Sequence, residues 1–222
     1  MKNKQIYTLI LMAILSLFVN QQIFANVFDE DFTEETLNPL WSIVGDGHNG
    51  INNGFYSFTD NADNNGTELF RNIQGLPSGS FETVLTAVFK KFCSPNTKTA
   101  FSWIMNGHNG NISLMYNSFG KLELRHNDFD GKNGQLAVID NIGVSDGTAI
   151  TMSIKFIKES NTIDVSYTKN SGEKVSIYNG RGTDGAAFDD CFSLRSTAKL
   201  FKFDDTPDKS LVLIDSWNVK DL

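Results

Sequence analysis

The sequence predicts an all-β protein, a sandwich of two antiparallel sheets, and three observations lead to this prediction. Short runs of alternating, β-branched or aromatic residues recur along the chain, each bounded by Gly, Asn, Asp or Ser. Dipeptides that tolerate positive φ in tight turns, such as Asn53-Gly54, lie between these runs. After residue 25, no segment shows a sustained helical period. Many short strands joined by Gly-rich turns are typical of a sandwich or jelly roll.

The strands are expected in order along the chain, and one pair shows the pattern most clearly. Residues 151–156 and 163–168 each alternate polar with apolar side chains, and the short loop 158–161 between them favours an antiparallel hairpin. Each strand of this pair therefore has one solvent-facing and one buried face. The full set of expected strands is 54–59, 67–73, 81–92, 99–105, 111–116, 121–126, 135–140, 149–157, 162–169, 173–178, 192–196, 198–203 and 211–219.

Residues 1–25 are predicted to be a secretory signal peptide. Lys2 and Lys4 precede a nearly unbroken apolar run over 6–19, and a polar break ending in Ala25 follows. The apolar run is shorter than the roughly 20 residues that cross a bilayer, and no later run is longer, so we expect no membrane span. We expect a secreted or periplasmic protein that is a monomer. Residues 26–222 are expected to form a single jelly-roll domain, because no linker or repeat divides them.

The charge balance bears on the class of partner. The whole chain has 19 Lys and Arg against 26 Asp and Glu, and the predicted signal contains two of the lysines and no acid. The remainder therefore has 17 basic and 26 acidic residues, a net charge of −9. Nucleic-acid binding requires clustered Lys and Arg, so we expect no nucleic-acid partner. A neutral or weakly charged glycan fits this balance better than a polyanion.

The two cysteines, Cys93 and Cys191, are expected to form a disulfide. An even number of cysteines in an exported chain usually means a bridge. On the loop-entropy model, a bridge between residues this far apart would restrict the unfolded chain by about 4 to 5 kcal/mol.

Four segments, two near each end of the chain, resemble a known superfamily. The opening residues 28–32 and 37–41, and the closing residues 200–205 and 213–219, resemble the first strand and the last strand pair of concanavalin A-like jelly rolls of the laminin G, glucanase and lyase type. The resemblance covers nearly the whole chain after the signal, and it implies the sandwich fold more directly than it implies a chemistry.

Three shorter segments are similar to alginate-lyase-like polysaccharide lyases. They are 67–71, which reads Thr-Glu-Leu-Phe-Arg, 106–108, which reads Asn-Gly-His, and the strand near 192–199, which lacks the tyrosine of that family. The resemblance implies a β-elimination at a uronate, with His108 as base, Tyr116 or Tyr178 as acid, and Arg71 or Arg125 with Asn106 neutralising the carboxylate. A lyase therefore fits better than a glycoside hydrolase, because the paired acids of a retaining glucanase strand are missing.

Carbohydrate binding uses many of the same positions differently. Aromatic faces stack on sugar rings, and Asn, Asp and Arg side chains bind hydroxyl groups. The expected contacts on the concave sheet are Trp103, Asn106, His108, Tyr116, Arg125 and Tyr178. Trp41 and Trp217 are expected in the core. We favour a carbohydrate-binding domain, with a polysaccharide lyase as the alternative and a structural or adhesive module as a third class.

No motif demands a cofactor, although one loop offers oxygen ligands. Asp60 and Asp63 lie in a run of Asp and Asn residues over 60–65, and Asp204, Asp205 and Asp208 form a second acidic group. Ca²⁺ prefers such ligands, but Asp and Asn are also ordinary turn residues. A structural Ca²⁺ at either place is a hypothesis. Zinc ligand spacing is absent around His48, His108 and His126.

Overall fold

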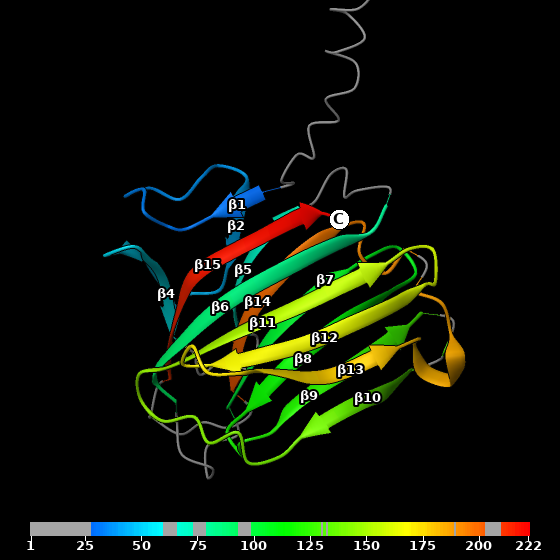
Figure 1. Cartoon of the computed structure of the whole chain (residues 1–222). Helices are drawn as coiled ribbons and strands as arrows, with labels where there is room; N and C mark the ends of the chain where they lie inside the picture. The colour runs from blue at the N-terminus through cyan, green and yellow to red at the C-terminus, as the bar shows by residue number, and fades with distance from the viewer. Residues whose placement is uncertain are drawn as a thin grey trace, which may run out of the picture.

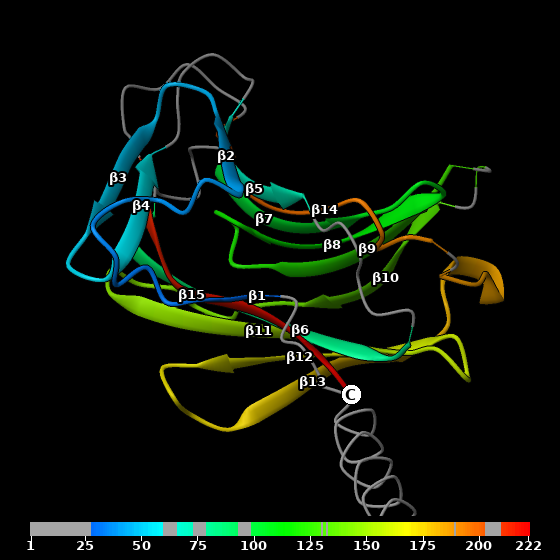
Figure 2. The ribbon, with the colours of Figure 1, turned by 90° about the horizontal axis from the view of Figure 1, so that it is seen from above.

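The computed structural model describes residues 28–59, 66–72, 79–92, 99–129, 131, 133–188, 190–202 and 210–222. Within them, fifteen strands form two antiparallel sheets that face each other across a core (Figures 1 and 2). The predicted fold class, an all-β sandwich of two antiparallel sheets, is therefore confirmed. The described part of the chain contains no helix with the length and apolar character that crossing a membrane demands.

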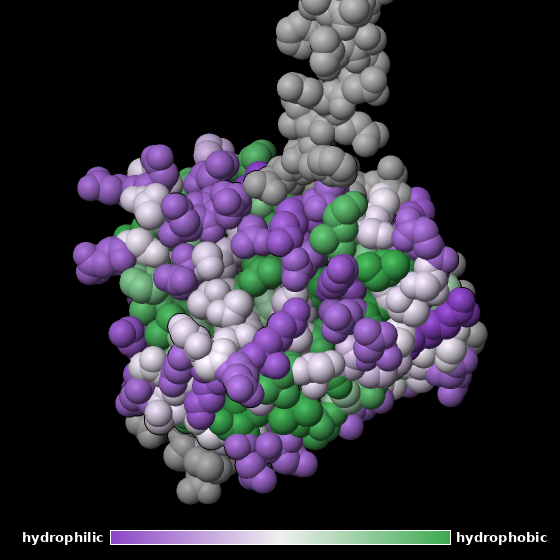
Figure 3. Space-filling view, in the orientation of Figure 1, coloured by the Kyte–Doolittle hydropathy of each residue, from purple (hydrophilic) through white to green (hydrophobic). Residues whose placement is uncertain are grey.

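The first sheet has eight strands. Their order is β13 (Lys174–Gly180), β12 (Thr162–Lys169), β11 (Thr148–Ile157), β6 (Phe81–Lys91), β15 (Leu211–Asp221), β4 (Phe55–Thr59) and β3 (His48–Asn52), and β1 (Phe28–Glu30) pairs with β15. Figure 3 looks onto the outer face of this sheet and shows hydrophilic and apolar residues interspersed. A short 3-10 turn, η1 (Thr183–Gly185), follows β13.

The second sheet has seven strands. Their order is β10 (Asn133–Ile139), β9 (Leu122–Asp128), β8 (Gly110–Asn117), β7 (Thr99–Asn106), β14 (Arg195–Lys202), β5 (Thr67–Asn72) and β2 (Trp41–Val44). The strands of this sheet are bowed, and Figure 2 shows their ends turning away from the other sheet, so its outer face is concave. Because β14 lies between β5 and β7, residues distant in sequence are adjacent on this face.

Most expected strands are present, and the differences have local causes. The predicted runs 192–196 and 198–203 are one strand, β14, because ladders to β5 and β7 continue through Thr197. Residues 192–194 precede that strand, and Phe192 packs against Phe81 with ring centroids 5.2 Å apart. Neither β2 nor β3 was predicted, since β2 has only 4 residues and β3 reads His-Asn-Gly-Ile-Asn, a sequence typical of a turn.

The hairpin turn at Asn53-Gly54 shows why that dipeptide is informative. Both residues have positive φ, 52° and 77°, and they join β3 to β4. Two successive residues with positive φ match the right-handed twist of the flanking strands, and Asn and Gly adopt this conformation at the least steric cost. The hairpin between β11 and β12 is also found as predicted, with Ile157 opposite Thr162.

The core lies between the two sheets and is built by alternation. In β6, every second residue from Phe81 to Phe89 is buried, and the residues between them point outward. Trp41 and Trp217 pack together with ring centroids 5.0 Å apart, which confirms their predicted place in the core. Burying a large apolar side chain contributes about 1.5 to 3 kcal/mol, so this alternation stabilises the pairing register as well as the fold.

The predicted disulfide involves Cys93, which lies outside the described residues, and Cys191, which is buried. Their described neighbours lie at opposite ends of β6. Phe92 packs on Phe89 with ring centroids 5.1 Å apart, whereas Phe192 packs on Phe81. Nothing in the described part of the chain supports the bridge, and it stays a prediction.

Candidate functional site

One row of polar side chains crosses the outer face of the seven-stranded sheet. The row has one residue on each of six adjacent strands, and each residue is paired directly with the row residue on the next strand. Directly paired residues of antiparallel strands project from the same face of the sheet. The adjoining residues Met105, Ile112 and His126 are buried in the core, so the row points away from it. We call this set the amide row: Asn72, Arg195, Asn106, Asn111, Asn127 and Asn133.

Only one hydrogen bond joins two side chains of the amide row. The amide nitrogen of Asn127 donates to the amide oxygen of Asn111 at 2.9 Å. Within the described part of the chain, the side-chain amides of Asn72, Asn106 and Asn133 have no hydrogen-bond partner. A primary amide offers two donor hydrogens and an acceptor oxygen. The row therefore presents unused donors and acceptors along one line.

The turn between β7 and β8 borders the amide row and depends on a close backbone approach. A Cβ atom on Gly107 would lie 1.6 Å from the carbonyl oxygen of Asp190, so only glycine fits there. The next two residues, His108 and Asn109, are exposed. The carbonyl oxygen of Asn109 accepts the backbone N–H of Phe129 at 2.9 Å, which ties the β9–β10 turn to this one.

Phe129 is the exposed aromatic residue at this end of the sheet. Its side chain is 64% exposed, two residues beyond Asn127 of the amide row. Single exposed apolar residues are common, but an aromatic ring beside a line of amides is the combination that sugar rings and hydroxyl groups require. The sequence signal that could have identified it is an aromatic residue within the polar turn 128–131.

Two further rows lie beside the amide row on the same face. The next row contains Phe70, Thr197, Ile104, Ser113, Arg125 and Gln135, and the one after it contains Glu68, Lys199, Ser102, Met115, Glu123 and Val138. One ion pair joins the two rows, and a second lies within the row that contains Glu68. Arg125 pairs with Glu123 at 3.1 Å, and Lys199 pairs with Glu68 at 2.7 Å.

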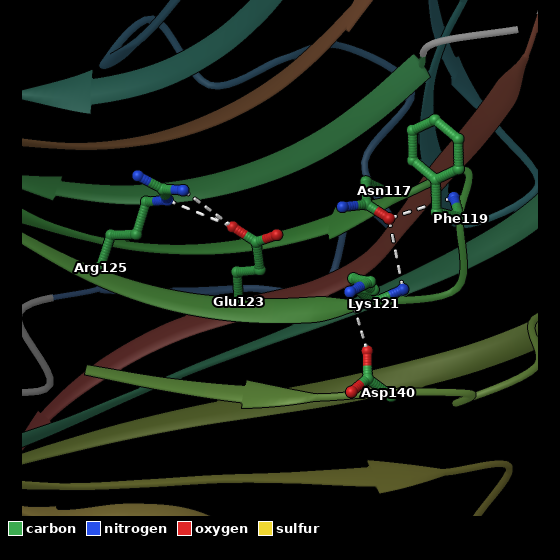
Figure 4. A network of polar contacts seen from close by, with 6 residues as sticks. All are labelled: Asn117, Phe119, Lys121, Glu123, Arg125 and Asp140. Carbon is green, nitrogen blue, oxygen red and sulfur yellow. Dashed lines mark hydrogen bonds and ion pairs between the residues drawn. The ribbon is translucent and has the colours of Figure 1, made fainter. Parts of the chain in front are cut away.

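Figure 4 shows the polar network at the far end of β9. Arg125 lies against Glu123, and the amide oxygen of Asn117 accepts the backbone N–H groups of Phe119 and Lys121 at 3.1 and 3.3 Å. Lys121 pairs with Asp140 at 3.1 Å. This network fixes the β8–β9 turn and satisfies its charges internally, in contrast to the unused amides at the other end of the face.

The structure places two predicted contacts inside the core. Trp103 has no exposed surface, and its indole N–H donates to the hydroxyl oxygen of Ser196 at 3.2 Å. Tyr116 is 3% exposed, its hydroxyl oxygen accepts the backbone N–H of Val144 at 3.3 Å, and burial raises its pKa. Neither ring can stack on a glycan at the surface. This corrects the prediction for both residues, whose alternation places them on the inner face of the sheet.

The remaining predicted residues are divided between different places. Asn106 and Arg125 lie on the outer face, and His108 lies in the exposed turn beside the amide row. Arg71 faces the opposite way, with its guanidinium carbon 4.6 Å from the ring centroid of Phe28, and burial lowers its pKa against the effect of Glu30. Tyr178 lies on β13 of the other sheet, and its hydroxyl donates to the carbonyl oxygen of Arg181.

The residues of the elimination scheme are therefore not assembled into one site. Arg71 and Arg125 lie on opposite faces of the seven-stranded sheet and are four strands apart, which is roughly 19 Å at the usual strand spacing. Tyr116 faces inward while Arg125 faces outward. This arrangement does not bring a base, an acid and a neutralising cation to one substrate carbon. The lyase resemblance has no support in the described geometry.

A buried Cys–His contact lies behind the amide row. The Cys191 sulfur is 3.8 Å from Nε2 of His126, and Nδ1 of that ring accepts the backbone N–H of Thr183 at 3.2 Å. The ring has no exposed surface, and burial lowers its pKa, which favours the neutral imidazole. No group of three or more His, Cys, Asp or Glu side chains in the described ranges is arranged to hold a metal ion. Asp60, Asp63 and 204–208 lie outside those ranges.

Solved structures with the same arrangement of sheets include plant lectins. Basic winged bean lectin with Tn-antigen has a TM-score of 0.61 and 11% identity, over 87% of this chain and 96% of that chain. Lectin I-B4 from Griffonia simplicifolia, in its metal-free form, has a TM-score of 0.58 and 11% identity, over 88% of this chain and 99% of that chain. The fold is a concanavalin A-like β-sandwich.

The same fold is found in part of a glycoside hydrolase structure. The GH43 protein BlXynB from Bacillus licheniformis has a TM-score of 0.56 and 14% identity, over 86% of this chain. The match covers 39% of that longer chain. No family model and no curated protein matches the sequence. At these identities, the comparisons show the fold, and the concanavalin A-like resemblance of the sequence is confirmed at that level.

Proposed function

We propose that this protein is an exported carbohydrate-binding domain whose glycan site is the outer face of the seven-stranded sheet, centred on the amide row. The observation that carries the proposal is the alignment of five asparagines and one arginine on six adjacent strands. Sugar hydroxyls both donate and accept hydrogen bonds, and amides offer both functions. A concave face on a lectin-like fold supports the same reading.

The dimensions of the amide row suit an extended glycan lying across the strands. Neighbouring strands are about 4.8 Å apart, so the six members span roughly 24 Å. A pyranose ring is similar in length to one strand spacing, and successive sugars would therefore meet successive amides. The ring of Phe129 lies beyond one end of β9, where it can stack on a sugar face.

The amide row is held by the sheet before a ligand arrives. Its members stand on paired strands, and the ladder fixes their backbones in place. The bond between Asn111 and Asn127 also orients those two side chains. A rigid site loses less conformational entropy on binding than a mobile loop, which favours this face over the turns. Export is supported by residues 1–25, whose pattern is that of a signal peptide.

Affinity electrophoresis through gels with a panel of neutral and uronate polysaccharides tests the proposal. The test variant is Asn111→Ala with Asn127→Ala, and a second variant is Phe129→Ala. The control is Asn179→Ala, an exposed asparagine on β13 of the other sheet. We expect the double variant to weaken retention about tenfold, because a hydrogen bond contributes about 0.5 to 1.5 kcal/mol.

Three results would overturn the proposal. One is the absence of retention on every polysaccharide while the protein is folded by circular dichroism. Another is equal loss of retention in Asn179→Ala and in the double variant, since that would place the site elsewhere. The third is ultraviolet absorbance from an unsaturated uronate, since this product would make the protein a lyase.

A further inference from the structure

Arg195 occupies a distinct place in the amide row. It is the member with a formal charge, and register places it between Asn72 and Asn106. Its guanidinium carbon lies 5.0 Å from the ring centroid of Phe70, one of the outward residues of the neighbouring strand β5. Stacking on an aromatic face orients the guanidinium plane and leaves its N–H edge available.

The other cations in the three rows of this face are neutralised by acids. Lys199 pairs with Glu68 and Arg125 pairs with Glu123, at 2.7 and 3.1 Å. By contrast, no carboxylate among the described residues lies within ion-pair distance of Arg195. Among the described residues, these three rows therefore carry one cation without an acidic partner, on a chain whose predicted mature form has a net charge of −9.

A buried hydroxyl group lies next to Arg195. Thr197 is two residues further along β14, on the same face, and is 2% exposed. Its hydroxyl oxygen has no hydrogen-bond partner within the part of the chain that the structure describes. Burying a hydroxyl without a partner costs free energy, and such groups in native structures call for an explanation. The hydroxyl oxygen is itself buried, so a ligand at Arg195 would reach it only after the atoms that cover it move.

We propose that Arg195 binds a carboxylate carried by the glycan, and that the preferred ligand is a largely neutral chain with sparse acidic groups. This inference rests on the proposed function and names its ligand class. A guanidinium matches a carboxylate with two parallel hydrogen bonds. The flanking amides of Asn72 and Asn106 suit the hydroxyls beside it. One cation neutralises one acid, whereas the acidic protein repels a densely charged polymer.

The experiment compares two uronate-bearing polymers, glucuronoxylan and gum arabic, each before and after chemical reduction of its carboxyl groups to alcohols. Retention is measured for the full protein, for Arg195→Gln and for the control Arg181→Gln, an exposed arginine after β13. We expect roughly tenfold tighter binding to an acidic polymer than to its reduced form, because hydrogen bonds to charged groups are the stronger class. Arg195→Gln should remove this preference and keep binding to the reduced polymer, while Arg181→Gln keeps both.

The possible outcomes separate this inference from the proposed function. Equal retention on both forms of a polymer, or an acid preference unchanged in Arg195→Gln, would overturn the role of Arg195 and leave glycan binding intact. Tighter binding to the densely charged polygalacturonate, or to a sulfated dextran, than to glucuronoxylan would overturn the sparse carboxylate as the ligand. No retention on any polymer would remove both proposals. A preference that weakens as salt is raised would support the ionic contact.

Discussion

Replacing Trp103 with phenylalanine separates a core role from a binding role. The indole is fully buried, and its N–H donates to the hydroxyl oxygen of Ser196 at 3.2 Å. That hydroxyl in turn donates to the sulfur of Met105 at 2.9 Å. Trp103→Phe therefore removes buried ring atoms together with one hydrogen bond. It leaves the outer face of β7, including Asn106, unchanged in sequence.

The expected loss of unfolding free energy is about 1 to 3 kcal/mol. Truncation to alanine at a buried tryptophan typically costs about 3 to 5 kcal/mol, and phenylalanine retains much of the ring. The lost hydrogen bond contributes about 1 kcal/mol of this. Ser196→Ala, which leaves the indole N–H buried without its acceptor, should cost about 1 to 3 kcal/mol. In the double variant, the two losses should overlap by about 1 kcal/mol, the coupling expected for a shared bond.

Urea unfolding gives the stabilities, and polysaccharide retention under native conditions gives the binding. We expect Trp103→Phe to lower the urea midpoint and to change retention by less than about twofold. The reasoning would be refuted by unchanged stability with a several-fold loss of retention. That result would mean that the indole contacts the ligand. Additive losses in the double variant would argue against the bond between Trp103 and Ser196.

Three further predictions follow from buried groups. Glycan binding should leave the tryptophan emission maximum unchanged, since Trp41, Trp103 and Trp217 are at most 5% exposed; a shift on titration would contradict the core assignment. Burial lowers the pKa of His126 in the native state, so the unfolded state binds the proton more tightly, and stability should fall as the pH drops below about 6.5. In His126→Gln, the urea midpoint should depend less on pH between pH 7 and 5.5 than in the unmodified protein. An equal pH dependence in the two proteins would exclude this histidine as the cause. Gly107→Ala should lower the unfolding free energy measured with urea by about 1 to 3 kcal/mol, because its Cβ would meet the carbonyl oxygen of Asp190. Wild-type stability would show that the backbone at Gly107 does not pack against Asp190.

The sequence by itself determined the fold class, because alternation and turn chemistry are local properties. The runs at 81–92 and 162–169 correspond to β6 and β12 within a residue, and Asn53-Gly54 forms the expected hairpin turn. Burial of Trp41 and Trp217 was also expected from the sequence, since they stand in strands that close the core. Each of these features depends on residues that are near one another in the chain.

The tertiary structure decided which polar residues share a face. Trp103 and Asn106 are three positions apart on β7, so they point to opposite sides of the sheet, and strand pairing and packing decided which side faces the core. The amide row joins Asn72 to Asn133 through β14, whose place between β5 and β7 no local pattern specifies. Arg195 was not a candidate from the sequence, because its neighbours Phe70, Asn72 and Asn106 come from distant segments. Non-local strand pairing created this surface, and only the folded sheet contains that information.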